Sequence, residues 1–131
     1  IVCPWNSYAV KTDEPAFKGV DGNFLLTELI LMDDEEFRRR FKGSPIKRIK
    51  RRGLLRNVAV ALGNSKNLQA VPFLIKALKD KEPLIRAHTV WALGELLLFE
   101  SIALLDGKLA AETEPMVLQE LEGLRQRYLA G

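Results

Sequence analysis

Residues 41–65 read FKGSPIKRIKRRGLLRNVAVALGNS, a block of cations that runs directly into an apolar helix rich in small residues. The surrounding segment 37–79 holds thirteen Lys and Arg residues and neither Asp nor Glu, whereas all seventeen acidic residues lie outside it. The net charge of +3 therefore hides a strongly positive middle between acidic flanks. A dense patch of one sign attracts polyanions, most commonly nucleic-acid phosphates. We expect a nucleic-acid surface here, with a solvated helix face of no function as the alternative.

The local signals in this stretch predict a helix that starts at Ser44-Pro45 and ends at Gly63-Asn64. Ser caps a helix and Pro suits its first position, while Gly-Asn is typical of a C-cap and turn. The apolar face changes side near Gly53, so the helix is either clamped between two neighbours or broken there. The residues on the two sides are Ile46, Ile49 and Gly53, and Leu55, Val58 and Leu62.

A sequence repeat with a longer period begins in this helix and continues toward the C-terminus. Ala61-Leu62-Gly63 recurs as Ala92-Leu93-Gly94, with Arg86 as the counterpart of Arg56, and residues 82–85 (EPLI) return as residues 114–117 (EPMV). Each Pro is expected at the first position of a helix, and the partner helices are expected over 68–79 and 101–111. A repeat of about thirty residues with two helices and no strand signal predicts an all-α fold, a short α-solenoid of HEAT-like helical hairpins stacked about three times.

The remaining segments frame this array. Residues 9–21 have no period and predict a linker, and a first helix is expected from Asp21 or Asn23 to Met32. A second helix is expected from Asp33 or Asp34 to Gly43, with Phe37 packed against Phe41. The closing helix, 115–129, is predicted as a terminal cap. Its inner stripe is expected to comprise Val117, Leu121, Leu124 and Leu129.

The composition predicts a soluble domain. The chain has 131 residues, 47% hydrophobic and 28% charged, and its apolar runs, such as 96–99, are too short to cross a bilayer. The N-terminus lacks a signal-peptide pattern and one Cys forms no internal disulfide, so we expect a cytoplasmic protein without a membrane partner. Trp91 is expected in the core, with base stacking as the alternative, and His88 is expected to be a packed or capping residue.

No catalytic residue and no complete metal site can be assigned. The acidic residues are scattered singly along helices, and the single cysteine, Cys3, cannot form a thiolate cluster by itself. Cys3 is followed by Pro4, the dipeptide that ends a bacterial-type iron–sulfur motif. Taken alone, that dipeptide is weak support for a cluster.

Three motifs together carry a resemblance. Residues 2–6 read VCPWN, residues 41–48 read FKGSPIKR, residues 56–65 read RNVAVALGNS, and HEAT-like repeats follow. In this combination the chain closely resembles the C-terminal region of the epoxyqueuosine reductase family, over nearly its whole length. The resemblance implies a parent oxidoreductase that reduces epoxyqueuosine to queuosine at the wobble base of tRNA, in queuosine biosynthesis, with 4Fe–4S clusters and cobalamin.

The resemblance also implies a division of the chain. Residues 1–22 would be the tail of an iron–sulfur, ferredoxin-like segment and a linker, and residues 23–131 the HEAT-like repeat domain. Cys3 would ligate a 4Fe–4S cluster, while the other cluster ligands and the cobalamin pocket would lie in an upstream catalytic domain. We therefore expect neither a cofactor nor reductase activity in this piece alone.

The charge pattern and the resemblance converge on tRNA as partner. An enzyme that acts on a base within folded tRNA has to hold the backbone, and Lys and Arg on rigid helices do this. The expected contacts are Lys47, Arg48, Lys50, Arg51, Arg52 and Arg56, with Asn57 and Lys66 extending the patch; Asn64 is either a further contact or a turn residue. The alternatives are a HEAT-like scaffold for an acidic protein partner and a stand-alone DNA-binding repeat protein.

Overall fold

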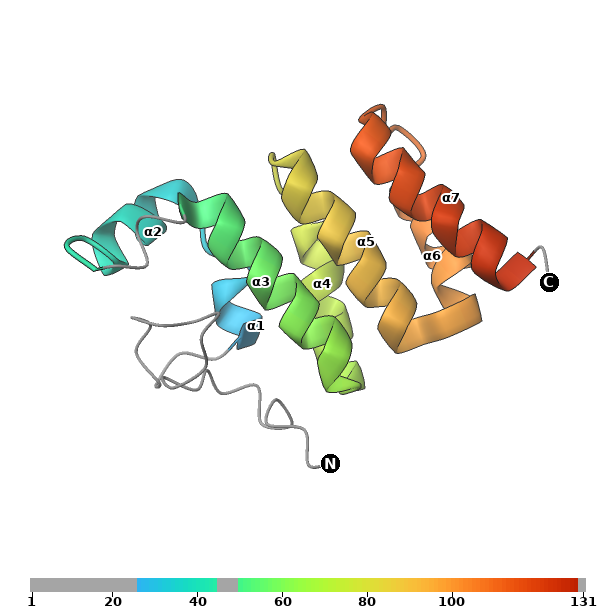
Figure 1. Ribbon diagram of the computed structural model, residues 1–131, viewed down its shortest axis with the longest axis horizontal. Coiled ribbons are helices and arrows are strands. Elements are labelled where there is room, and N and C mark those ends of the chain that lie inside the picture. Colours follow the sequence, from blue (N-terminus) through green and yellow to red (C-terminus); the bar gives the residue numbers. More distant parts are fainter. Residues whose placement is uncertain (1–25, 45–49, 130–131) are drawn as a thin grey trace.

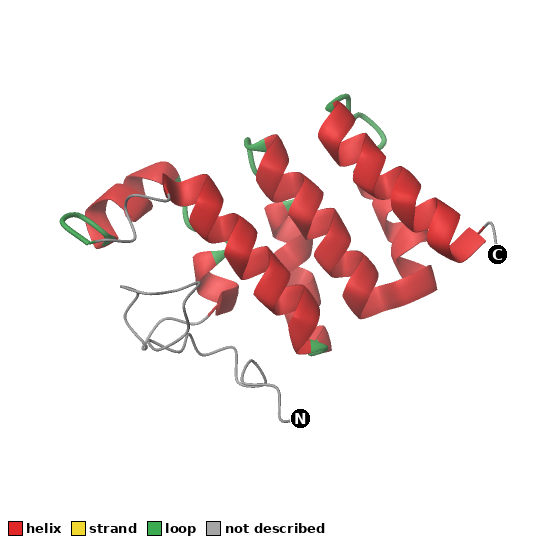
Figure 2. Cartoon of the chain, in the orientation of Figure 1, coloured by secondary structure: helices red, strands yellow, loops and turns green. Residues whose placement is uncertain are grey.

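A computed structural model describes residues 26–44 and 50–129 of the chain. Within these ranges the structure consists of helices joined by short loops and contains no strand (Figure 2). The elements are α1 (Leu26–Leu29), α2 (Asp34–Arg40), α3 (Lys50–Ser65), the 3₁₀ turn η3 (Leu68–Ala70), α4 (Val71–Ala77), α5 (Pro83–Leu97), the 3₁₀ turn η4 (Leu98–Glu100), α6 (Ser101–Lys108) and α7 (Pro115–Leu129). The predicted all-α class is confirmed.

The helices form two layers. The long helices α3, α5 and α7 lie side by side, and the shorter α1, α4 and α6 lie behind them (Figure 1). Each long helix follows a shorter one along the chain, so the stacked unit is a helical hairpin, as the repeat predicts. α5 packs against α3, α4, α6 and α7 and is therefore the centre of the fold.

The two prolines of the repeat begin helices. α5 starts at Pro83 and α7 starts at Pro115, which confirms both predicted starts. Proline suits this position because its fixed φ is already helical and the first-turn N–H that it lacks would have no partner in the helix. The predicted partner helices are also present, although α4 ends at Ala77 and α6 at Lys108, two and three residues earlier than expected.

The second predicted helix is present, and its start is confirmed by its cap. The Asp33 side chain accepts a hydrogen bond from the Glu36 backbone N–H at 2.8 Å. The helix ends at Arg40, three residues before the predicted Gly43, where φ is +77°. The rings of Phe37 and Phe41 lie 5.2 Å apart, as their spacing of one turn predicts. The predicted start of the first helix, at Asp21 or Asn23, lies outside the described residues.

Gly53 does not interrupt α3. The helix runs unbroken from Lys50 to Ser65, and Leu55, Val58 and Leu62 are fully buried. The apolar face therefore changes side within one continuous helix, which excludes the alternative of a break at Gly53. The predicted start at Ser44-Pro45 and the first apolar side, Ile46 and Ile49, fall at or within the gap in the described residues.

The predicted end of α3 at Gly63-Asn64 is wrong. Both residues lie inside the helix, and the left-handed residue that follows is Lys66, with φ of +61°. Gly63 serves packing instead, because a Cβ at this position would lie 2.7 Å from Cζ3 of Trp91 and 3.0 Å from Cα of Ala92. The glycine thus lets α5 approach the backbone of α3.

The closing helix buries three of its four predicted inner residues. Val117, Leu121 and Leu124 are buried, and the Leu124 side chain packs over Gly94 of α5. The prediction for Leu129 is wrong, since this residue is 56% exposed and borders an open hollow together with Phe99 and Ile102.

Residues 83–108 are long and apolar enough to cross a membrane by length and composition. They do not form one straight helix, because the chain turns at Leu98, where φ is +56°, and continues as η4 and α6. α5 has neighbours in its own layer on both sides. This accounts for its apolar sequence as the core helix of the array.

Candidate nucleic-acid interface

A row of exposed cations marks the start of α3. Lys50, Arg52 and Arg56 are exposed, and Arg52 and Arg56 are one helical turn apart on the same face. None of the three forms an ion pair with a described residue. Asn57 stands beside them, and its side-chain oxygen accepts a hydrogen bond from Arg56 at 3.1 Å. We call Lys50, Arg52, Arg56 and Asn57 the basic row.

Arg51 differs from its neighbours. Its side chain is buried, Nε donates to the Met32 carbonyl oxygen at 2.8 Å, and Nη2 donates to the Asp80 carboxylate. Asp34 lies 3.9 Å from Nε. The expectation that Arg51 faces phosphate is therefore replaced by a structural role, in which it ties the end of the α1 region to the α4–α5 loop.

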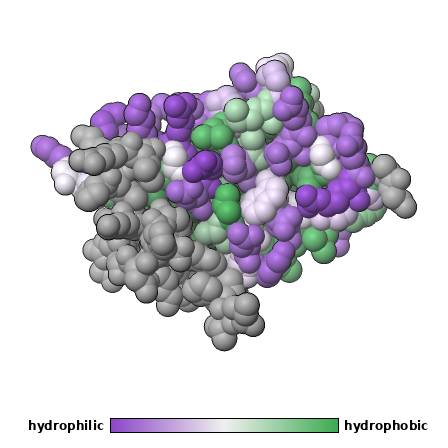
Figure 3. Space-filling model, in the orientation of Figure 1, coloured by the Kyte–Doolittle hydropathy of each residue, from purple (hydrophilic) through white to green (hydrophobic). Residues whose placement is uncertain are grey.

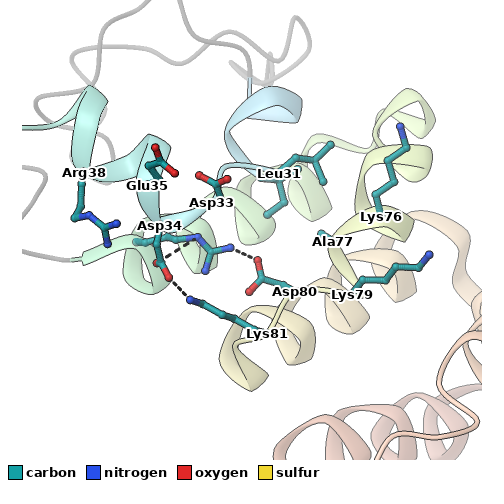
Figure 4. A pocket seen from close by; sticks show the side chains of 12 residues that line it. Leu31, Asp33, Asp34, Glu35, Arg38, Lys76, Ala77, Lys79, Asp80 and Lys81 are labelled. Carbon is teal, nitrogen blue, oxygen red and sulfur yellow. Dashed lines mark hydrogen bonds and ion pairs between the residues drawn. The ribbon is translucent and has the colours of Figure 1, made fainter.

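A hollow of about 530 Å³ lies beside Arg51, between α2 and the α4–α5 loop (Figure 4). Asp33, Asp34, Glu35 and Asp80 line it together with Arg38, Lys76, Lys79 and Lys81. Lys81 reaches across to Asp34, and this hydrogen bond, aided by neighbouring cations, holds the pKa of the Asp34 carboxyl below its ordinary value against the effect of burial. Because both signs alternate around it, this hollow is not a simple phosphate site.

The other predicted contacts have mixed placements. Lys66 is exposed but its ammonium group pairs with Glu95 at 3.3 Å, so it is engaged within the protein. Asn64 is exposed in the last turn of α3, which leaves its contact role open and excludes the role of a turn residue. Lys47, Arg48 and Cys3 lie outside the described residues, as does the proposed division at residues 22–23.

A second hollow of about 270 Å³ opens on the layer of long helices. It is lined by Val60 of α3, His88 and Trp91 of α5, and Glu120 of α7. Trp91 is half-buried and packs against the core, as predicted, yet part of its ring also borders this hollow. His88 is packed as predicted, with Nδ1 2.9 Å from the Leu84 carbonyl oxygen.

The structure contains two arginine–carboxylate pairs that the sequence patterns do not predict. Arg86 binds both carboxylate oxygens of Glu112, at 2.9 and 3.1 Å, and repeats in the next hairpin what Arg51 does with Asp80. Arg51, rather than Arg56, is therefore the counterpart of Arg86. The signal that could have found these pairs is the spacing of their acids, since Asp80 and Glu112 each stand three residues before a repeated proline.

Among residues 26–44 and 50–129, no cluster of three His, Cys, Asp or Glu side chains could hold a metal ion. The described residues therefore do not supply an iron–sulfur site. What they do present is the basic row, the buried pair of Arg51 and Asp80, and a small hollow with an aromatic wall.

Comparison with known proteins bears on this arrangement. Residues 51–125 match the family model described as HEAT repeats. Epoxyqueuosine reductases from Xanthomonas campestris, Pseudomonas aeruginosa and Escherichia coli are 39%, 41% and 35% identical to the chain over 98, 97 and 98 residues. These matches cover 72%, 71% and 72% of this chain but only 28%, 27% and 26% of those proteins, so the chain spans about a quarter of the length of these relatives.

Two solved structures share the fold. A selenomethionine-labelled epoxyqueuosine reductase superposes with a TM-score of 0.70 at 25% identity, covering 87% of this chain and 34% of that one. An epoxyqueuosine reductase from Bacillus subtilis gives a TM-score of 0.66 at 24% identity, with the same coverage. The resemblance inferred from the sequence is confirmed, since the chain is similar to part of several epoxyqueuosine reductases, and the chain belongs to the HEAT repeat family.

Proposed function

We propose that this chain is the tRNA-docking HEAT-repeat portion of a protein that reduces epoxyqueuosine in tRNA. The observation that carries the proposal is the basic row, whose exposed cations lack ion pairs with described residues and lie on a rigid helix. Cations already paired with carboxylates would have to leave those partners before they could bind phosphate. No ion pair with a described residue has to be broken before phosphate oxygens bind to the exposed cations Lys50, Arg52 and Arg56.

The rest of the parent activity belongs to the same proposal. The relatives are named for epoxyqueuosine reduction, and this chain corresponds to about a quarter of their length. We assign the reduction, with its cobalamin and 4Fe–4S clusters, to an upstream catalytic domain. Cys3 would contribute one cluster ligand there, and Lys47 and Arg48 would supply further phosphate contacts. Docking by this chain would then hold the tRNA while a base is presented to the catalytic domain.

The test is binding of folded tRNA across a salt series. For the unaltered chain, affinity should fall steeply as salt rises. Replacing Arg52 and Arg56 together by Gln should weaken binding and lower the log–log slope by roughly 0.7–0.9 for each phosphate that the variant no longer binds. Arg51 is left unchanged, because its buried pair with Asp80 makes any substitution there a folding mutation.

A matched control separates site from net charge. Replacing Lys108 of α6 and Arg125 of α7 by Gln removes the same charge from positions far outside the cationic segment 37–79. This pair should leave the slope nearly unchanged. If both double variants weaken tRNA binding equally, the basic row is not the docking site. Tight, salt-sensitive binding of an acidic protein with little binding of tRNA would favour the scaffold function instead.

A further inference from the structure

We propose that the hollow formed by Val60, His88, Trp91 and Glu120 binds an unpaired nucleobase that carries an exocyclic amino group. The hollow lies on the layer of α3, α5 and α7, where polar and apolar side chains intermingle (Figure 3). The inference rests on the proposed function, since it names which part of an RNA this face would recognise. Its volume of about 270 Å³ is just below the range of roughly 300–1,000 Å³ typical of small-molecule sites, which fits a single base.

The aromatic wall of the hollow is held in place. A Cβ added to Gly63 would lie only 2.7 Å from Cζ3 of Trp91, so the indole packs directly against the backbone of α3. A ring fixed by packing loses little conformational entropy when a base stacks on it. Stacking on aromatic side chains is the usual way in which proteins hold unpaired bases.

The polar groups of the hollow favour one kind of base. The Leu84 carbonyl oxygen can only accept, so Nδ1 of His88 donates to it, and in the neutral imidazole this leaves Nε2 as an acceptor. Glu120 adds a carboxylate, which also accepts and which repels phosphate. Two acceptors suit a base edge with an amino group, as in cytosine, whose N4 carries two N–H donors, better than uracil, whose edge has a single N–H between two oxygens.

The hollow continues the basic row. Arg52, Arg56 and Val60 follow one another at intervals of four residues, so they lie along one face of α3 about 6 Å apart. A single strand whose phosphates contact the two arginines would bring a following base to Val60 and Trp91. At the next turn of α5, Glu95 is paired with Lys66 and Arg127, at 3.3 and 3.0 Å, which offsets its negative charge.

The experiment uses the fluorescence of Trp91 in the full chain. The chain has two tryptophans, so Trp5→Phe leaves Trp91 as the only reporter. Tetracytidylate should quench this fluorescence on binding, and it should bind several-fold more tightly than tetrauridylate. Trp91→Ala removes the reporter, so its binding is measured with a fluorescent label on the RNA. This variant should bind tetracytidylate about five- to a hundred-fold more weakly, while Trp91→Phe should retain most of the affinity.

A second variant tests the base preference without touching the core. Glu120→Gln replaces one acceptor by a group that also donates, so the preference for tetracytidylate over tetrauridylate should shrink toward unity. A helical circular dichroism spectrum equal to that of the parent checks each variant's fold. The base site would be overturned if tetracytidylate did not quench Trp91. It would also be overturned if the parent bound both oligonucleotides equally well and Glu120→Gln did not change either affinity.

The tRNA salt series keeps this result distinct from the proposed function. If tRNA binds with a steep salt dependence while tetracytidylate leaves Trp91 unquenched, docking stands and the base site fails. If tetracytidylate quenches Trp91 but tRNA does not bind, the base site stands and the tRNA-docking function fails. If neither RNA binds, both proposals are overturned.

Discussion

Arg51 and Arg52 show how far one residue's neighbourhood decides its role. The two are chemically identical and adjacent, yet a step of about 100° around α3 buries the first and exposes the second. The charge density of the segment was enough to predict the basic row. It could not identify Arg51 as internal, because Asp80, the carboxylate that neutralises it, is 29 residues away in the sequence.

The wrong prediction at Gly63 has a related reason. A glycine before Asn near the end of an apolar run is the local signature of a C-cap. In the structure its use is non-local, because the missing Cβ admits the ring of Trp91 and the backbone of Ala92. Local sequence signals indicate what a residue permits, and the packing of another helix decides which of the permitted roles it takes.

Gly63→Ala should therefore destabilise the fold. The added Cβ would overlap Trp91 and crowd the Ala92 backbone, and overpacking of this kind typically costs about 1–3 kcal/mol. The free energy of unfolding from urea titration measures the effect. Gly123→Ala is the matched control, because Gly123 is a helical glycine of α7 with nothing within 4 Å of its added Cβ, and it should gain about 0.5–1 kcal/mol. Equal effects of the two substitutions would contradict the close approach of α5 to α3.

At the level of elements, the sequence predicted helices best where their signals are local. The starts at Pro83 and Pro115 and the cap at Asp33 depend on residues within one turn, and all three are confirmed. Contacts between hairpins were not predicted. Arg86 and Glu112 are 26 residues apart, and only the folded array brings them together.

The pair of Arg86 and Glu112 makes stability depend on pH. Burial alone would raise the pKa of Glu112, but the hydrogen bonds from Arg86 and from the Glu114 backbone N–H outweigh it, so the folded-state pKa lies below the ordinary value of 4.5. A carboxylate with a depressed pKa stabilises the fold above its unfolded-state pKa. This contribution disappears as the pH falls through the folded-state value.

Glu112→Gln should thus lower the free energy of unfolding at pH near 7, by about 1–3 kcal/mol, and the difference from the parent should narrow below about pH 4. Urea titrations of both proteins at several pH values measure this. Glu122→Gln is the control, because Glu122 is 56% exposed and its pair with Arg125 is 3.5 Å long, so it should change little at any pH. A difference for Glu112→Gln that stays constant with pH would show that the charge pair is not its cause.

For the whole molecule, the arrangement predicts a gradient of local stability. α5 packs against both of its layer neighbours and both adjacent short helices, so it becomes free on every side only when the array opens completely. Backbone amide exchange, followed by mass spectrometry at the level of segments, should be slowest in α5 and faster in α2 and α6. Slowest exchange in α7 would contradict this picture, because α7 is at one end of the described array.

The two arginine–carboxylate pairs also give the array a direction. Arg51 and Arg86 each reach forward to an acid in the following hairpin, Asp80 and Glu112, and Arg86 stands three residues after Pro83. The same place after Pro115 is taken by Leu118, which is exposed and has no charge to offer. Hairpins copied from α4–α5 would therefore carry their own arginine and could be added in series, whereas a hairpin placed after α7 would have to join without this arginine–carboxylate pair.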